Sequence, residues 1–181
     1  TIMAKILWRP DQINDTHMMK FMDRVNNVYG LDINSYQDLH DWSIKKIPEF
    51  WKEIWNQSEI IHSRTYTEVV DDLYKMPGAK WFSGSRLNFA ENLLRYRNDD
   101  VAIYAKAENI PLRRITYNEL FNQVEALSHS LKTVGVRTGD RVVGFIPNIP
   151  EAVIAMLAAS ALGAIWSSAS PDFGVKGVLD R

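Results

Sequence analysis

The sequence predicts an α/β fold in two parts, a helical N-terminal lobe over residues 1–98 and the start of a mostly parallel sheet, with helices on both faces, over residues 99–181. Apolar residues recur at helical spacing through the first part. The pattern changes to short β-rich runs from residue 101, and residues 141–174 have the pattern of a strand, a helix and a second strand. Such a unit is typical of a parallel sheet wound with helices.

The helices of the first part are predicted from their start and stop signals. Thr16 is placed to cap a helix that Gly30 ends. Ser35 begins a second helix, and Pro48 opens a third segment with apolar residues at helical spacing. Residues 88–94 add a short helix capped by an asparagine. The whole of residues 1–98 is therefore expected to be helical.

Four of the six tryptophans lie in this first part and allow two interpretations. They could form a stacking surface for bases or sugars, but such surfaces come with a basic groove, and no basic run occurs here. We therefore expect aromatic anchors that pack the helical lobe together. These residues are Trp42, Trp51, Trp55 and Trp81.

The second part begins with a hairpin. Residues 101–105 and 112–117 are two β-rich runs separated by a turn-rich connection, and we expect them to pair antiparallel. Thr116 and Glu119 have the spacing of a capping box, which begins a helix that Gly135 ends. A hairpin followed by alternating helices and strands indicates the opening of a mostly parallel sheet.

The strand–helix–strand unit follows. Residues 142–146 form an apolar run suited to a strand buried on both faces. Asn148 is predicted to cap the next helix together with Glu151, and Gly163 to close it. Residues 164–168 then form the second strand. The last residues resemble the beginning of a further helix, so we expect the chain to be a fragment of a longer polypeptide.

Composition excludes several classes of protein. The chain of 181 residues is 46% apolar and 24% charged, as in ordinary globular domains, and its net charge of −1 predicts neither a nucleic-acid nor a membrane partner. It contains no cysteine, so disulfides and thiolate metal sites are excluded. The apolar run at residues 2–7 is too short for a signal peptide. A cytoplasmic location is expected.

The chemistry-bearing motifs are mostly absent. Neither the G-x-x-x-x-G-K-[ST] loop nor G-x-G-x-x-G occurs, and no G-x-S-x-G elbow follows a strand. The four histidines are scattered without metal-ligand spacing. We therefore predict no catalytic residue and no metal ligand within these 181 residues. The histidines are His17, His40, His62 and His129.

Four sequence segments carry a family resemblance: residues 81–94, WFSGSRLNFAENLL; 115–120, ITYNEL; 146–174, IPNIPEAVIAMLAASALGAIWSSASPDFG; and 171–181, PDFGVKGVLDR. Together they resemble the acyl-adenylate-forming ligases, and specifically those members that activate acetoacetate. Acetyl-CoA and propionyl-CoA synthetases are the alternative, although they usually carry Gly-Gly-Phe in place of residues 171–173. A non-catalytic α/β interaction module is a second alternative, against which the collinear order of the motifs argues.

The resemblance implies a fold, an activity and ligands. Residues 1–98 correspond to the acetyl-CoA-synthetase-type N-terminal region, and residues 99–181 to the first part of the AMP-binding α/β domain. The longer enzyme is expected to use ATP, magnesium and coenzyme A. The Ser/Thr/Gly-rich loop ending in lysine that this family uses for phosphates is absent here. The fragment alone is therefore expected to be inactive and to bind none of these ligands tightly.

One loop is a candidate site. By the resemblance, Ser170, Pro171, Asp172 and Phe173 correspond to a segment beside the pantetheine arm of coenzyme A. The loop also follows a predicted strand, and ligands of α/β sheets bind at the carboxyl ends of strands. The alternative is structural, with Pro171 and Asp172 starting the next helix and Ser170 as its cap.

The final prediction concerns self-association. A parallel strand at residues 164–168 needs a neighbour and cover on both faces. Without them, the sheet edge and an apolar patch around Ile165, Trp166, Val175 and Val178 are expected to bring two copies of the fragment together, or else the residues after Asp172 are expected to be mobile.

Overall fold

The computed structural model describes residues 7–181, which form two compact units. The first unit contains residues 7–60 and Tyr66–Ser85, and the second contains Ile61–Thr65 and Arg86–Arg181. Each unit is described by itself. The apolar run that was considered as a signal peptide lies almost wholly outside the described residues.

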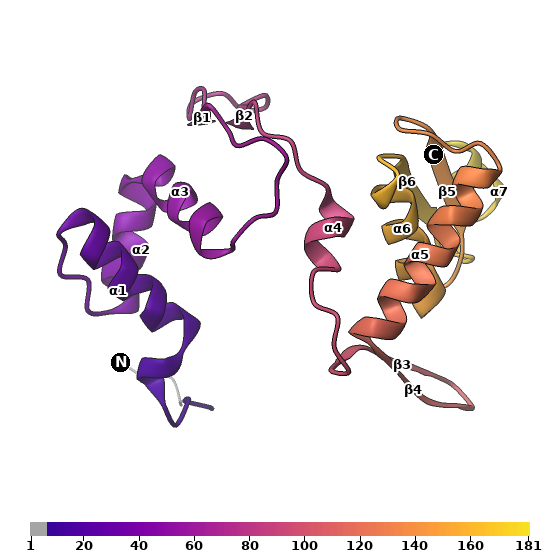
Figure 1. Ribbon diagram of the computed structural model, residues 1–181, viewed down its shortest axis with the longest axis horizontal. Coiled ribbons are helices and arrows are strands. Elements are labelled where there is room, and N and C mark those ends of the chain that lie inside the picture. The colour runs from indigo at the N-terminus through magenta and orange to yellow at the C-terminus, as the bar shows by residue number, and fades with distance from the viewer. Residues whose placement is uncertain (1–6) are drawn as a thin grey trace. The chain divides into compact units, whose positions relative to one another are not determined.

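The first unit is built from three α-helices, a short 3-10 helix and a small hairpin (Figure 1). Its elements are η1 (Ile13–Asp15), α1 (His17–Tyr29), α2 (Tyr36–Lys45), α3 (Ile47–Gln57), β1 (Glu68–Val70) and β2 (Trp81–Ser83). The two strands pair antiparallel. The expectation that residues 1–98 are all helical is therefore wrong at this hairpin, whose three-residue strands are too short to show alternation in the sequence.

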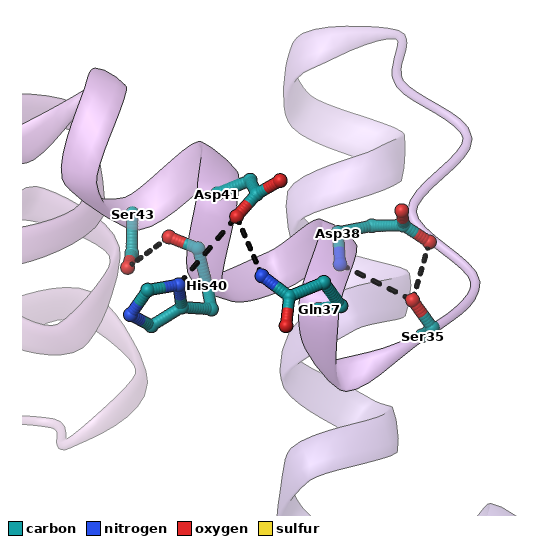
Figure 2. Close-up of polar contacts among 6 residues, drawn as sticks. All are labelled: Ser35, Gln37, Asp38, His40, Asp41 and Ser43. Carbon is teal, nitrogen blue, oxygen red and sulfur yellow. Dashed lines mark hydrogen bonds and ion pairs between the residues drawn. The ribbon is translucent and has the colours of Figure 1, made fainter. Parts of the chain in front are cut away.

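The predicted helix caps of this unit are confirmed. The Thr16 hydroxyl accepts a hydrogen bond from the Met19 backbone N–H, and Gly30 ends α1 with φ of 65°. Ser35 Oγ accepts from the Asp38 N–H at 3.2 Å and donates to the Asp38 carboxylate at 2.7 Å (Figure 2). The hydrogen bond from the Ser35 hydroxyl holds the pKa of Asp38 below its usual range.

The core of the first unit contains a buried charge. Phe21, Met22, Val25, Ile33 and Leu39 form its apolar part. Beside them Glu53, which is 1% exposed, accepts hydrogen bonds from Arg24 Nε at 2.7 Å and from the Tyr29 hydroxyl at 3.2 Å. Burial first, and the Glu53 charge second, raise the pKa of Tyr29 to about 12. The carboxylate thus has a cation and a hydroxyl for partners.

The tryptophans differ in how far they are buried. Trp42 and Trp55 are half-buried, as expected for anchors, and Trp55 lies 4.8 Å from the ring of Phe82. Trp51 and Trp81 are 41% and 43% exposed, and their rings meet edge to face at 6.0 Å. The predicted role as packing anchors therefore fits Trp42 and Trp55 better than Trp51 and Trp81.

The second unit alternates helices and strands (Figure 1). Its elements are α4 (Phe89–Leu93), β3 (Val101–Ala107), β4 (Ile110–Thr116), α5 (Tyr117–Thr133), β5 (Arg141–Phe145), α6 (Pro150–Ala161), β6 (Ile165–Ala169) and α7 (Val175–Leu179). β3 and β4 pair antiparallel, and β5 and β6 pair parallel, as predicted. Within residues 7–181 no helix has the length and apolar character needed to cross a membrane.

The core of the second unit lies where α4, α5 and α6 meet. α6 packs against α5 and α4, because its many alanines leave a smooth surface. The buried residues come from four elements and the residue after α4: Ala90, Leu94, Ile115, Leu120, Val124, Ile154, Leu157 and Ala158. The capping box of Thr116 and Glu119 at the start of α5 is present as predicted.

The predicted cap of α6 is wrong. Ile149, not Asn148, is the N-cap residue, and no side chain caps this helix. Pro150 occupies the first turn, and a turn closed from Ile149 N–H to the Pro147 carbonyl precedes it. Glu151 is instead paired with Arg113 of β4 at 2.9 Å. The predicted helix end is confirmed, since Gly163 has a φ of 73°.

Candidate functional site

The candidate loop leaves the carboxyl edge of the parallel pair. β5 and β6 run in register from Arg141 opposite Ile165 to Phe145 opposite Ala169. The Ile146 N–H donates to the Ala169 carbonyl at 3.1 Å and extends the pairing by one residue. Both strands therefore end at the same edge of the sheet. In α/β folds, ligands bind at this edge, beyond the carboxyl ends of the strands.

A glycine–tryptophan contact supports this edge. A Cβ added to Gly144 of β5 would lie 2.6 Å from Cη2 of Trp166 and 3.2 Å from the side chain of Ile146. The indole of Trp166 therefore lies directly over the backbone of the neighbouring strand. Only glycine leaves room for this packing, which fixes the two strands immediately before they end.

The loop is closed by its own hydrogen bonds. Ser170 Oγ donates to Asp172 Oδ2 at 3.0 Å and accepts from the Asp172 N–H at 3.3 Å. The Phe173 N–H donates to the Ser170 carbonyl at 3.0 Å. The backbone N–H groups of Asp172 and Phe173 therefore have hydrogen-bond partners within the turn. The side chains of Pro171 and Asp172 remain exposed. The loop has a defined shape before any ligand arrives.

The structural alternative for this loop is wrong. The cap of α7 is Gly174, and the helix begins at Val175. Ser170 closes a turn with Asp172 instead of capping a helix. The physical reason is that the N–H of Phe173 donates to the carbonyl of Ser170 and closes a turn over residues 170–173, which is complete before the helix begins at Val175.

Phe173 is held from two sides. The guanidinium carbon of Arg181 lies 4.1 Å from the centre of its ring, within the range of a cation–π contact. A Cβ added to Gly177 would lie 3.5 Å from the Phe173 ring, so the glycine lets the ring lie close to α7. Phe173 still exposes 41% of its surface. Sequence reasoning missed Arg181, whose only signal is its position at the end of the segment that includes α7.

The loop combines charged and apolar surface. The carboxylate of Asp172 is exposed at its centre, and the positively charged guanidinium of Arg181 lies against the Phe173 ring. The exposed part of that ring offers apolar surface to an uncharged chain. Across the described residues 7–181, no group of three or more histidine, aspartate or glutamate side chains could hold a metal ion.

Two family models match the chain. The model described as AMP-binding enzyme matches residues 89–179, and the model described as acetyl-coenzyme A synthetase N-terminus matches residues 36–93. The candidate loop lies within the first match, and α2, α3 and the small hairpin lie within the second.

Individual relatives extend over nearly the whole chain. The acetoacetyl-CoA synthetase of Mus musculus is 48% identical over 98% of this chain, and the malonamoyl-CoA synthetase of Penicillium aethiopicum is 41% identical over 98%. The solved acetoacetyl-CoA synthetase of Streptomyces lividans superposes with a TM-score of 0.87 and 39% identity over 98% of the chain. The chain spans only 27%, 25% and 28% of those three proteins, respectively.

Proposed function

Because the chain belongs to the AMP-binding enzyme family, we propose that it is part of an acetoacetyl-CoA synthetase, an acid–thiol ligase that joins acetoacetate to coenzyme A at the expense of ATP. The observation that carries this proposal is the 48% identity to the mouse enzyme over 98% of the chain. The chain accounts for about a quarter of that enzyme's length, so the activity is proposed for the longer protein.

The chemistry explains why ATP is required. A carboxylate is a poor acyl donor because its oxygen is a poor leaving group, whereas adenylation makes AMP the leaving group, and a thiol can then displace it. The residues that stabilise the negative charge of the phosphates during adenylation are proposed to lie outside these 181 residues. The 181 residues contain neither of the two common phosphate-binding loops. Magnesium is implied by the family, and in these enzymes' chemistry it would be held by one or two carboxylates together with the phosphates of ATP.

The loop at Ser170, Pro171, Asp172 and Phe173 is proposed to lie beside the pantetheine arm of coenzyme A. The exposed part of the Phe173 ring supports this proposal, because the methylene groups of the arm suit an apolar surface. Coenzyme A supplies the thiol, and these residues position the arm that carries it.

Phe173→Ala in the full-length enzyme is expected to raise the KM for coenzyme A by about tenfold, the size of a lost apolar contact. Acetoacetate-dependent pyrophosphate exchange without coenzyme A should be unchanged. Val175→Ala is the matched control, because Val175 is 78% exposed and two residues away. An unchanged KM in the Phe173 variant would remove the loop from the coenzyme A site.

The proposed function is tested by pyrophosphate exchange with the full-length protein and a panel of acids. Acetoacetate should give the highest kcat/KM, and the 181-residue chain alone should give no exchange. A preference for acetate or propionate would assign the protein to the acetyl-CoA or propionyl-CoA synthetases. Exchange by the 181-residue chain would contradict the proposed location of the phosphate-binding residues.

The isolated 181-residue chain is proposed to self-associate through the face of β5 and β6. The strand β5, expected to be buried on both faces, in fact exposes much of its apolar surface, and alternate positions share one face. Trp166 and Val178 were expected to belong to the apolar patch, but both are half-buried and are therefore not members of it. Its members are Val143, Phe145, Ile165 and Val175, which are 65%, 57%, 55% and 78% exposed.

Sedimentation velocity should therefore detect dimers whose fraction rises with concentration. Lysine at both Phe145 and Ile165 should return the chain to a monomer, because a charge on each side of the interface cannot be buried without a partner. Tyr104→Lys, at a position that is 63% exposed in β3, is the control and should leave the dimer intact. A chain that is monomeric at every concentration would contradict this proposal.

Three further assignments remain proposals. The boundary near residue 98, between the helical N-terminal region and the first part of the AMP-binding domain, agrees with the change in sequence pattern, although α4 packs against α6 on the far side of it. A cytoplasmic location is supported by the absence of cysteine. The net charge of −1 supports the proposal that neither nucleic acid nor membrane is a partner.

A further inference from the structure

We propose that the groove between α1, α2 and α3 is a docking site for the chain's own segment Leu7–Trp8, with the indole of Trp8 as its anchor. The groove has a volume of about 450 Å³ and is lined mainly by apolar side chains. α1 contributes His17, Met18 and Phe21; α2 contributes Tyr36, Leu39, His40 and Ser43; and α3 and the residue after it contribute Phe50, Ile54, Gln57 and Ser58. None of these residues belongs to the candidate loop at residues 170–173.

The floor of the groove is the aromatic part of the first unit's core. Phe21 and Phe50 meet edge to face at 5.9 Å, and Trp42 meets Phe50 at 6.2 Å. Aromatic rings favour such edge-to-face partners over an isolated position in water. A further indole entering the groove extends this cluster, and the volume is within the range that proteins use for medium-sized apolar ligands.

The proposed occupant is exposed in this structure. Leu7 and Trp8 are 90% and 79% exposed, and they adjoin each other in the chain. Two large apolar side chains side by side in water lack the burial that drives folding. The groove in the same unit offers that burial.

The length of chain favours this occupant over a partner from solution. The Thr16 hydroxyl donates to the Ile13 carbonyl at 2.8 Å and ties η1 to the start of α1, where His17 and Met18 form one wall of the groove. An extended chain from residue 8 to residue 13 spans up to about 17 Å. This exceeds the ~8–10 Å between the axes of packed helices, so Trp8 can reach across the groove. The tether also raises its local concentration above that of any free partner.

Charge supports the same placement. Arg9 follows Trp8, and α2 carries the carboxylates of Asp38 and Asp41, which adjoin the groove-lining residues Leu39 and His40 in the sequence but do not line the groove themselves. Asp41 lies 3.6 Å from the His40 ring nitrogen (Figure 2). A docked Trp8 therefore brings the Arg9 guanidinium toward a helix that carries two carboxylates, and opposite charges attract.

The test uses the absence of cysteine from the chain. Leu7→Cys is combined with Ser43→Cys or with Ser58→Cys, which places the second thiol on one wall of the groove or the other. Matched controls combine Leu7→Cys with Gln37→Cys or Lys52→Cys, on the same two helices but outside the groove lining. The four loop lengths differ little, so chain entropy alone predicts similar rates. Disulfide formation in the 181-residue chain is followed under mild oxidation by non-reducing gel and mass spectrometry.

We expect at least one groove pair to form its intrachain disulfide about tenfold faster than both controls, since a thiol pair needs Cα atoms within about 7 Å. Trp8→Ala in that background should abolish the difference. In denaturant all four pairs should react at similar rates, which checks that thiol reactivity is equal. Equal rates in the native chain would overturn the proposal. Fast disulfides between two chains would overturn it as well, because the occupant would then be a second copy.

Discussion

Replacing Trp55 with alanine should lower the free energy of unfolding of the first unit by about 3 kcal/mol, the lower end of the range for removing a buried aromatic side chain, because the indole is half-buried. The indole lies 4.8 Å from the ring of Phe82 and 5.2 Å from that of Tyr66, and these two rings are themselves 5.2 Å apart. Trp55 thus joins α3 to the chain around β1 and β2. Its removal opens a cavity and takes away one of the aromatic contacts that hold α3 to the small hairpin.

Trp51→Ala is the internal control for this result. Trp51 lies one turn earlier in α3 and is 41% exposed, so its loss should cost only about 1 kcal/mol. Urea unfolding followed by circular dichroism at 222 nm measures both values. Equal losses for the two variants would show that Trp51 is as well packed as Trp55 and would contradict the exposure seen here.

Arg24→Met should destabilise the first unit by about 3 kcal/mol at neutral pH, because removing one partner leaves a buried charge uncompensated. The carboxylate of Glu53 has only 2% of its side chain exposed and receives the Arg24 Nε–H at 2.7 Å. The hydroxyl of Tyr29 then remains as a hydrogen-bond donor without positive charge. Methionine retains most of the apolar stem of arginine, so the loss reports the charge and its hydrogen bond.

Two further variants distinguish this ion pair from general packing. Lys20→Met removes an exposed positive charge one turn earlier on α1 and should change stability by less than about 0.5 kcal/mol. Arg24→Met combined with Glu53→Met should be more stable than Arg24→Met alone, because an apolar pair can replace a buried ion pair without large loss. Strictly additive losses in the double variant would mean that the two residues do not interact.

Much of the fold could be predicted because its signals are local. A capping residue and its partner lie within one turn, and so Thr16, Ser35 and Thr116 were found from spacing alone. The β1–β2 hairpin could not be found in this way. Its strands have three residues each, and Trp55, whose ring packs against Phe82 of β2, lies more than ten residues before the hairpin in the chain. Contacts of this kind have no periodicity to detect.

For the candidate loop, too, some features could be predicted from the sequence and others could not. Its position after a strand could be predicted, because the pattern of residues 164–168 is local. The pairing of Ser170 with Asp172 and the stacking of Arg181 on Phe173 could not. A serine at position 170 is compatible with a helix cap and with a turn, so the sequence alone does not distinguish them. The hydrogen bond from the Phe173 N–H to the Ser170 carbonyl shows that it forms a turn. Asn148 failed as a cap for a related reason, since Pro150 fixes the helix start one residue later.

The first unit's apolar core has a consequence for how the protein is made. Its buried members extend only from Phe21 to Leu39, with Phe50 and Ile54 packed beside them. Contacts over such short separations cost little chain entropy and form quickly. We expect this three-helix core to fold on the ribosome while the strands of the second unit are still being translated, since N-terminal units generally fold first. Nascent chains stalled after about residue 120 should then resist limited proteolysis within α1–α3, and Val25→Asp, at a position that is 0% exposed, should remove that resistance.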